Sequence, residues 1–134
     1  MNILEDLIIF EMANSHQGSI EHGIAIIREM GKIARVNKVH AAVKLQYRDL
    51  NTFIHQDARG KKDVPHVLRF EETRLEYDDF CVLIEEIRKE GLVTMSTPFD
   101  EKGVIDAASD KLPSSGKSLY LIRLYHKSQR FHPL

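Results

Sequence analysis

The sequence predicts an α/β fold built on a parallel β-sheet, and three observations support this prediction. Apolar runs typical of buried strands alternate along the chain with segments whose apolar residues recur at the helical period. The first of these runs, "LIIFEMA", is nearly continuous in apolar character, as in parallel strands that are covered on both faces. The chain has 134 residues, 43% of them hydrophobic and 29% charged, which fits about one small globular domain.

The first third of the chain gives one strand, one helix and a second strand. We expect the first strand over residues 6–13 and the helix over about residues 20–34, with Ser19 as its N-cap. The second strand is expected over residues 40–46, where the run "HAAVKLQ" is again mostly apolar. The apolar stripe of the helix recurs at spacings of four and three residues and consists of Ile20, Ile24, Ile27 and Met30.

A long polar stretch, roughly residues 47–72, separates the second strand from the second helix. That helix is expected from Thr73 to about Glu90, because Thr73 and Glu76 fit a capping box and Gly91 stands at the usual C-terminal stop. Loops longer than about 15 residues without structure of their own are uncommon and often functional. The buried stripe of the second helix is expected to be Phe80, Leu83, Ile84 and Ile87.

The third strand is expected over residues 92–97 and ends before Pro98. A short helix is expected to start at residue 100 or 101 and to run through "KGVIDAAS". From residue 110 the alternation of elements stops, and a strand in "SLYLIRLY" is the one regular segment suggested there. We therefore expect residues 110–134 to form a divergent tail that is frayed or does not belong to the fold.

Composition excludes several classes of function. The formal net charge is −1, so no bulk charge favours nucleic acid or an acidic membrane as a partner. No apolar run approaches the roughly 20 residues of a membrane-spanning helix. Cys81 is the single cysteine, which excludes an internal disulfide and a CxxC motif. We expect Cys81 to be a small buried side chain near Phe80 and Ile84, and the protein to work in the reducing cytoplasm.

Polar side chains occur at the carboxyl end of each predicted strand. By strand alternation Lys44 and Gln46 share one face of the second strand, while Glu11 and Thr97 lie near the ends of the first and third strands. Ligands of α/β barrels and of open α/β sheets bind at this end of the strands. Two interpretations stay open for the charged pair: Glu11 and Lys44 form an ion pair with each other, or both face a bound polar molecule.

Cationic side chains of the long polar stretch could line the mouth of such a site and attract an anionic substrate. For each of them the favoured interpretation is nevertheless a solvated surface charge. The residues in question are Arg48, His55, Lys61, Lys62 and Arg69.

Three motifs at the strand ends resemble those of the sialic acid synthase family, that is, N-acetylneuraminate synthase and its bacterial relatives. "FEMANSHQG" resembles the first-strand motif, in which Glu and then His-x-Gly come after the strand. "AVKLQ" is similar to the second-strand motif, with Leu45 where Phe is typical, and "STPFDEKGV" is similar to the third. The motifs occur in the family's order, and the resemblance covers roughly residues 6–109.

The resemblance implies a partial (β/α)8 TIM barrel: residues 1–109 would form its first three βα units, the N-terminal part of the synthase domain. It also implies a transferase of carbohydrate biosynthesis, which joins phosphoenolpyruvate to N-acetylmannosamine or a related amino sugar in an aldol-type condensation. The products are a nine-carbon keto acid and phosphate. In the full-length family a divalent metal, Mn²⁺ or Mg²⁺, polarises the sugar aldehyde as a Lewis acid.

Matching positions imply roles for four residues. Lys44 would hold the anionic groups of phosphoenolpyruvate, Thr97 would hydrogen-bond its carboxylate, and Gln46 would face the amino sugar. Glu11 would be a positioning or proton-transfer group, so Glu11 and Lys44 are the catalytic candidates. His16 is interpreted as a residue that organises the loop rather than as a ligand.

The sequence departs from the family after the third βα unit. A complete barrel takes about 200 to 250 residues or more, the family's lysine on the fourth strand has no recognisable counterpart, and no metal ligands are expected in this chain. His126 and His132 are present, but their surroundings do not match the family's metal-binding motifs. We hypothesise an interrupted reading frame or a truncated gene product. Such a chain is expected to be inactive alone. It is also expected to be a homo-oligomer, to be prone to aggregation or to be partly unfolded.

Two alternatives remain. The chain could be a non-catalytic remnant that binds a ligand or pairs with another chain. It could also derive from another phosphoenolpyruvate-condensing barrel, such as a keto-deoxy sugar phosphate synthase. The combination of Glu-x4-His-x-Gly with Ser-Thr-Pro-Phe-Asp speaks against the latter.

Overall fold

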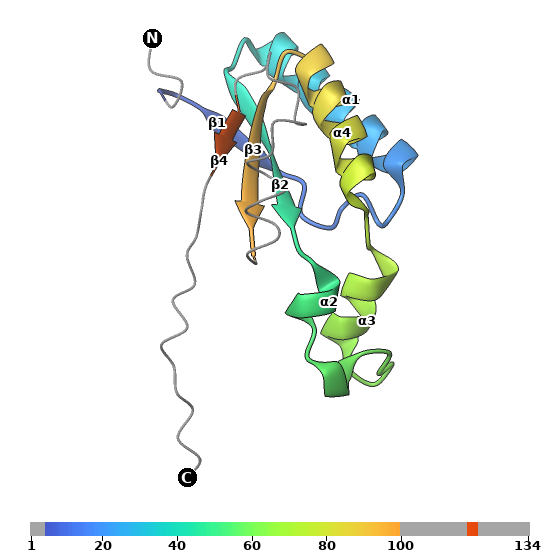
Figure 1. Ribbon diagram of the computed structural model, residues 1–134. Helices are drawn as coiled ribbons and strands as arrows, with labels where there is room; N and C mark the ends of the chain where they lie inside the picture. The colour runs from blue at the N-terminus through green and yellow to red at the C-terminus, as the bar shows by residue number, and fades with distance from the viewer. Residues whose placement is uncertain (1–4, 100–117, 121–134) are drawn as a thin grey trace.

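Parallel strands form a single sheet in the computed structural model, which describes residues 5–99 and the short segment 118–120. Their spatial order β1-β2-β3-β4 matches their order in the sequence, as in a barrel and unlike a doubly wound sheet, whose order reverses at a switch point (Figure 1). The predicted parallel α/β architecture is therefore confirmed. The strands are β1 Ile8–Glu11, β2 Ala41–Tyr47, β3 Val93–Pro98 and β4 Ser118–Tyr120.

Strand β4 lies within the segment 110–134 and pairs in parallel with β3. The helix predicted after residue 100 falls outside the described residues, and so do His126 and His132.

Two long helices, α1 (Ile20–Asn37) and α4 (Tyr77–Lys89), cover one face of the sheet (Figure 1). Three short helices come after β2 and lie beyond the carboxyl ends of β2 and β3. They give the predicted loop a structure of its own. They are α2 (Leu50–Phe53), the 3₁₀ helix η1 (Gln56–Ala58) and α3 (Pro65–Glu72).

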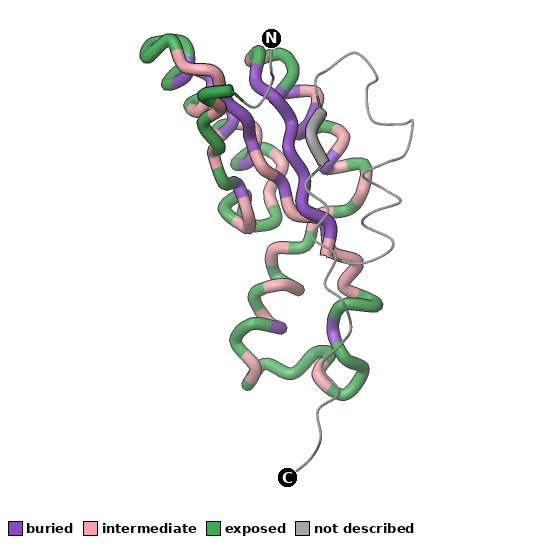
Figure 2. Tube along the Cα trace, turned by 90° about the vertical axis from the view of Figure 1, so that its left-hand side faces the viewer, coloured by how far each residue is buried: buried purple, intermediate pink, exposed green. Residues whose placement is uncertain are grey.

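The main core lies between the sheet and the two long helices. Figure 2 shows buried residues running along the strands, while the outer turns of the helices are exposed. Both predicted helical stripes point into this core: Ile27 and Leu83 are fully buried, and Ile20, Ile24 and Met30 pack against it partly buried. The side chains without any exposed surface here are Met12, Ile27, Val43, Leu45, Leu83 and Ile87.

The opposite face of the sheet carries a smaller apolar cluster of Ala42, Val93 and Met95. Strand β2 therefore sends alternate side chains to two faces, as predicted. The expected burial of the first strand on both faces is wrong, because Ile8 is 44% and Ile9 is 48% exposed. Among the described residues β1 pairs on one side only, with β2, so it is an edge strand.

The predicted start of the second long helix is also wrong. Helix α4 begins at Tyr77, and the backbone N–H of Glu76 donates to Asp79 Oδ2 at 2.8 Å in a capping box. Thr73 instead ends α3, where its hydroxyl donates to the carbonyl oxygen of Arg69 at 2.7 Å. The expected N-cap, Thr73, and the observed N-cap, Glu76, lie only three residues apart. Thr73 and Glu76 have the spacing of a capping box, but the capping box that forms joins Glu76 and Asp79.

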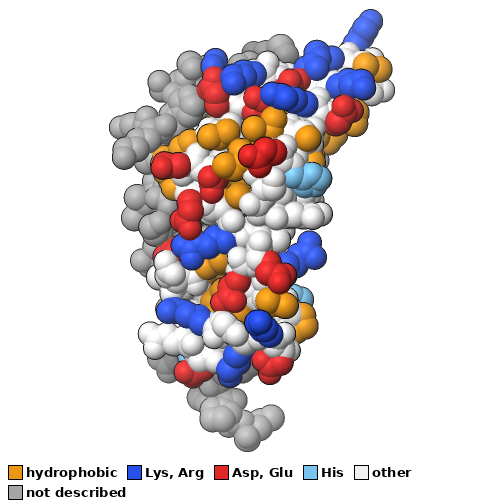
Figure 3. Space-filling model, turned by 90° about the vertical axis from the view of Figure 1, so that its right-hand side faces the viewer, with side chains coloured by type: hydrophobic (Ala, Val, Ile, Leu, Met, Phe, Trp, Pro, Cys, Tyr) orange, Lys and Arg blue, Asp and Glu red, His pale blue; other side chains and the backbone are white. Residues whose placement is uncertain are grey.

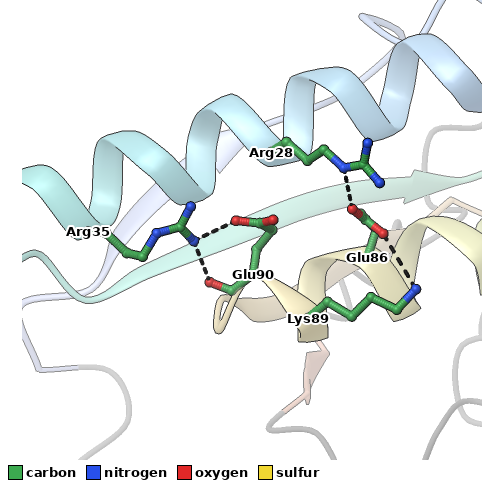
Figure 4. Close-up of polar contacts among 5 residues, drawn as sticks. All are labelled: Arg28, Arg35, Glu86, Lys89 and Glu90. Carbon is green, nitrogen blue, oxygen red and sulfur yellow. Dashed lines mark hydrogen bonds and ion pairs between the residues drawn. The ribbon is translucent and has the colours of Figure 1, made fainter.

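Ion pairs join α1 to α4 and to its C-cap residue Glu90 (Figure 4). Arg28 Nε lies 2.6 Å from Glu86 Oε1, and Arg35 Nη1 lies 2.5 Å from Glu90 Oε2. The Glu86 side chain is only 8% exposed and has Lys89 Nζ at 3.7 Å as a second cation. Arg28 and Lys89 thus give the buried Glu86 carboxylate the cationic partners that it needs.

The helical surface carries charges of both signs. Lys and Arg side chains are interspersed with Asp and Glu side chains over the face shown in Figure 3. Cys81, expected to be buried, is half-buried on α4. Within the described residues, none of the helices has the length and apolar character needed to cross a membrane.

Candidate functional site

An ion pair joins the carboxyl end of β1 to β2. Glu11 is the last residue of β1 and is paired in register with Lys44. The Lys44 ammonium contacts Glu11 Oε2 on the sheet face that carries Met95 rather than on the helical face. Of the two interpretations left open by the sequence, the ion pair between the two charges is therefore the one that the structure has. The Glu11 side chain is still 41% exposed and the Lys44 side chain 22% exposed, so both groups keep surface for a polar ligand.

Gln46 and Thr97 extend this row by one position toward the strand ends. Gln46 Nε2 donates to Glu11 Oε1 at 3.3 Å, and Thr97 is the register partner of Gln46 on β3. The Thr97 hydroxyl is buried and has no hydrogen-bond partner among the described residues. Leaving such a group unpaired costs about 1–3 kcal/mol, so it is a ready donor for a ligand. The four predicted residues thus lie on one face at one edge of the sheet, while their roles in substrate binding stay predictions.

A guanidinium group continues the network beyond the strand. Arg48 Nη2 donates to Gln46 Oε1 at 2.5 Å, and Arg48 Nη1 donates to Asn14 Oδ1 at 3.2 Å. Its Cζ atom lies 4.6 Å from the centroid of the Phe70 ring and 4.4 Å from that of Phe99. Burial lowers the pKa of Arg48. Because the amide oxygen of Gln46 accepts from Arg48, its amide nitrogen is turned toward Glu11.

Of the five cations predicted as surface charge, four are exposed and Arg48 is not. The interpretation is therefore wrong for Arg48. Arg48 directly follows β2, and its burial results from contacts with Phe70 and Phe99, which no local pattern in the sequence indicates. The four exposed residues are His55, Lys61, Lys62 and Arg69.

The turn between β1 and α1 is held by a buried histidine, as predicted. His16 is 3% exposed, and its Nδ1 accepts from the Gly18 backbone N–H at 3.1 Å. Burial, and then the nearby charge of His22, lower the pKa of His16, which keeps the ring neutral with Nδ1 free to accept. Gly18 has φ +74°, and a Cβ there would lie 2.8 Å from the carbonyl oxygen of Glu72, so the turn requires glycine.

A small open cavity lies between this turn, the end of β2 and the junction of α3 with α4. Of the four predicted site residues only Gln46 lines it, while Glu11, Lys44 and Thr97 lie on the adjoining sheet face. The described residues that line the cavity include two guanidinium groups and no carboxylate, which suits a polar or anionic ligand. The polar lining consists of Asn14, His16, Gln46, Arg48, Thr73 and Arg74.

The described residues do not fit the divalent metal that the resemblance implies. Within residues 5–99 and 118–120, His, Cys, Asp and Glu side chains do not gather in any group of three or more that could hold a metal ion. Glu11 offers carboxylate oxygens, but they accept from Lys44 and Gln46.

Comparison with known proteins gives a family and structural neighbours. The model of the NeuB family matches residues 32–114, more than half of the chain. This range contains the second and third motifs but not the first. The structure of a protein described as spore coat polysaccharide biosynthesis protein E from Chromobacterium violaceum is 44% identical with a TM-score of 0.72, over 76% of this chain and 30% of that chain.

The structure of N-acetylneuraminic acid (sialic acid) synthetase from Leptospira borgpetersenii serovar Hardjo-bovis is similar in fold, with a TM-score of 0.52 at 19% identity. The likeness covers 74% of this chain and 31% of that chain. The chain therefore spans about 30% of the length of each of these two neighbours. A search of curated proteins gives no match.

Proposed function

This chain belongs to the NeuB family, and from that premise we propose that it forms the N-terminal part of a phosphoenolpyruvate-dependent sugar-acid synthase. The reaction would condense phosphoenolpyruvate with an N-acetylated amino sugar to a nine-carbon keto acid. The observation that carries the proposal is the contact of Glu11 with Lys44 and Gln46, together with the buried hydroxyl of Thr97, the register partner of Gln46. These groups lie at the carboxyl ends of neighbouring parallel strands, where barrel enzymes bind their substrates.

Lys44 and Thr97 are the proposed ligands of phosphoenolpyruvate. The Lys44 ammonium would attract a phosphate or carboxylate group, and the Glu11 carboxylate in contact with the same ammonium partly offsets this attraction. Lys44 is partly exposed, so it can bind such an anion while it stays near Glu11. The Thr97 hydroxyl lacks a partner among the described residues, and a carboxylate oxygen would supply one.

Gln46 and Glu11 are proposed to act at the amino sugar and at the attacking water. The amide nitrogen of Gln46 carries two hydrogens, one of which is directed to Glu11, so the second can donate to the sugar. In the condensation the alkene carbon of phosphoenolpyruvate bonds to the aldehyde carbon, water adds to the resulting cation, and phosphate leaves. In this proposal the Glu11 carboxylate would take up the proton that the water releases.

Binding of phosphoenolpyruvate to the full chain tests this proposal by calorimetry. We expect binding that weakens about tenfold or more in Lys44→Met, because a charge-assisted contact is lost. Lys32→Met is the matched control, since Lys32 is an exposed lysine of α1, and it should bind as the unmodified chain does. No binding by the unmodified chain, or equal losses in the two variants, would contradict the proposal.

A second function, a non-catalytic binding module, is favoured by one observation: the described residues provide no metal site. In a phosphate-release assay with phosphoenolpyruvate, N-acetylmannosamine and Mn²⁺, turnover above the protein-free background excludes the binding module for this chain. Binding of phosphoenolpyruvate without turnover is expected both of a binding module and of the isolated N-terminal part of a synthase.

A further inference from the structure

We propose that Arg48 anchors a second anion subsite, next to the phosphoenolpyruvate site, which selects an amino sugar carrying a phosphate or carboxylate group over a neutral one. This inference rests on the proposed function and names the substrate class of the same site. The side-chain hydrogen bonds of Arg48 leave its positive charge uncompensated. Both bonds run to neutral amide oxygens, those of Asn14 and Gln46.

The setting of Arg48 makes an anionic partner favourable. Its Nε atom is buried and has no hydrogen-bond partner among the described residues, and burial lowers the pKa of the group. Desolvating a cation is costly unless an anion approaches it. A carboxylate or a phosphate matches the planar fork of a guanidinium group with two parallel hydrogen bonds.

Three aromatic rings hold the guanidinium in place. Its Cζ atom lies 4.4, 4.6 and 5.8 Å from the ring centroids of Phe99, Phe70 and Phe53. Phe53 also meets the other two rings edge to face, at centroid distances of 5.6 and 6.2 Å. An arginine fixed in this way loses little conformational freedom when a ligand binds. The helical excursion between β2 and α4, which supplies Phe53 and Phe70, therefore has a function in placing Arg48.

The remaining lining agrees with an anion. Arg74 brings a second guanidinium to the cavity, and its Nε lies 2.7 Å from Glu76, so it contributes less net charge than Arg48. The Thr73 hydroxyl already donates to the carbonyl oxygen of Arg69 and so offers an anion no hydrogen, but no carboxylate is found among the described lining residues. Gln46 connects the cavity to the reacting end of the site, because its oxygen faces Arg48 and its nitrogen faces Glu11. A sugar that contacts Gln46 can thus extend its anionic substituent toward Arg48.

The test compares three sugars by calorimetry on the full chain: N-acetylmannosamine, N-acetylmannosamine 6-phosphate and N-acetylmannosaminuronate. We expect one or both anionic sugars to bind about tenfold or more tightly than the neutral one. The 6-phosphate and the uronate distinguish phosphate from carboxylate as the natural group. Equal affinity for all three sugars, or no binding of either anionic sugar, would overturn the inference.

Variants locate the effect. Arg48→Met should remove the preference for the anionic sugar, Arg74→Met should reduce it about threefold, and Arg69→Met, an exposed arginine of α3, should leave it unchanged. If Arg48→Met fails to fold, the Nε–H resonance of Arg48 in the unmodified chain decides. The chemical shift of this resonance should change as the anionic sugar is added. An unchanged chemical shift at a sugar concentration that saturates the protein would contradict an anion subsite at Arg48.

The two proposals fail separately. Lys44→Met should no longer bind phosphoenolpyruvate but should still bind the anionic sugar. Arg48→Met should still bind phosphoenolpyruvate but should no longer prefer the anionic sugar. Loss of both ligands in both variants would overturn the second subsite and leave a single shared anion site.

Discussion

Replacing Gly18 with alanine tests how the turn after β1 is built. Gly18 has φ +74°, a conformation that costs an L-residue about 1–2 kcal/mol. The added Cβ would also lie 2.8 Å from the carbonyl oxygen of Glu72 and 3.4 Å from the Thr73 Cα. Both are backbone atoms, and forcing them apart costs about 1–3 kcal/mol more. We therefore expect Gly18→Ala to lower the free energy of unfolding by about 2–5 kcal/mol in urea titrations followed by circular dichroism.

Gly60→Ala is the matched control. Gly60 has φ +70°, but nothing lies within 4 Å of the position of its missing Cβ. It should therefore show the backbone strain alone, about 1–2 kcal/mol. The difference between the two variants isolates the contact of the first turn with the end of α3. Equal losses of stability in both variants would refute the close packing of the turn against α3.

Three further predictions concern the core, the pH dependence and the activity. Leu83→Ala should cost about 2–5 kcal/mol of unfolding free energy, because Leu83 is fully buried, whereas Val82→Ala, at a 45% exposed neighbour, should cost less than about 1 kcal/mol; urea titration of both checks this. The pKa of His16 in the folded state lies below its unfolded value of about 6.5, so on acidification the unfolded chain binds a proton before the folded chain does. The free energy of unfolding should therefore be constant above about pH 7 and should fall as the pH drops below about 6.5. Unfolding titrations across this range should show a smaller decline in His16→Gln, and an identical decline would contradict the assignment. The chain alone should release no phosphate from phosphoenolpyruvate and N-acetylmannosamine with Mn²⁺, since the described residues lack a metal site, and a malachite-green assay against a protein-free blank measures this.

Local periodicity carried most of the fold prediction. The alternation of β2 separates Val43 and Leu45, which face the helices, from Lys44 and Gln46, which face away, and the structure has this arrangement. The Ser19 cap also forms, because its hydroxyl accepts from the backbone N–H of His22 at 3.2 Å. Signals of this kind depend on neighbours in sequence and can be read without knowing the rest of the fold.

Features that depend on distant contacts were not predictable in the same way. The short helices between β2 and α4 are too brief to show an apolar period, so the stretch resembled a polar loop. Arg48 looked like a surface charge because its setting depends on Phe70 and Phe99, residues far along the chain. The exposure of Ile8 and Ile9 also could not be read from their apolar character, since burial of an edge strand depends on what pairs with it.

At the site, the sequence indicated which side chains share a face, and the structure adds how they connect. Strand register and side-chain length determine which of these polar side chains contact one another. The resulting chain of contacts runs from Lys44 through Glu11, Gln46 and Arg48 to Asn14. Neither the register nor this chain of contacts is encoded in a local pattern. The cavity beyond Gln46 likewise arises only where the first turn meets the junction of α3 and α4.

The most direct test of the site is an NMR titration of the full chain with phosphoenolpyruvate. We expect the Gln46 side-chain amide, the Lys44 ammonium and the Thr97 methyl resonances to shift together and to saturate at one ligand concentration. Shifts confined to the exposed residues Lys61 and Lys62, with these three resonances unmoved, would contradict a common binding site at the ends of β1, β2 and β3.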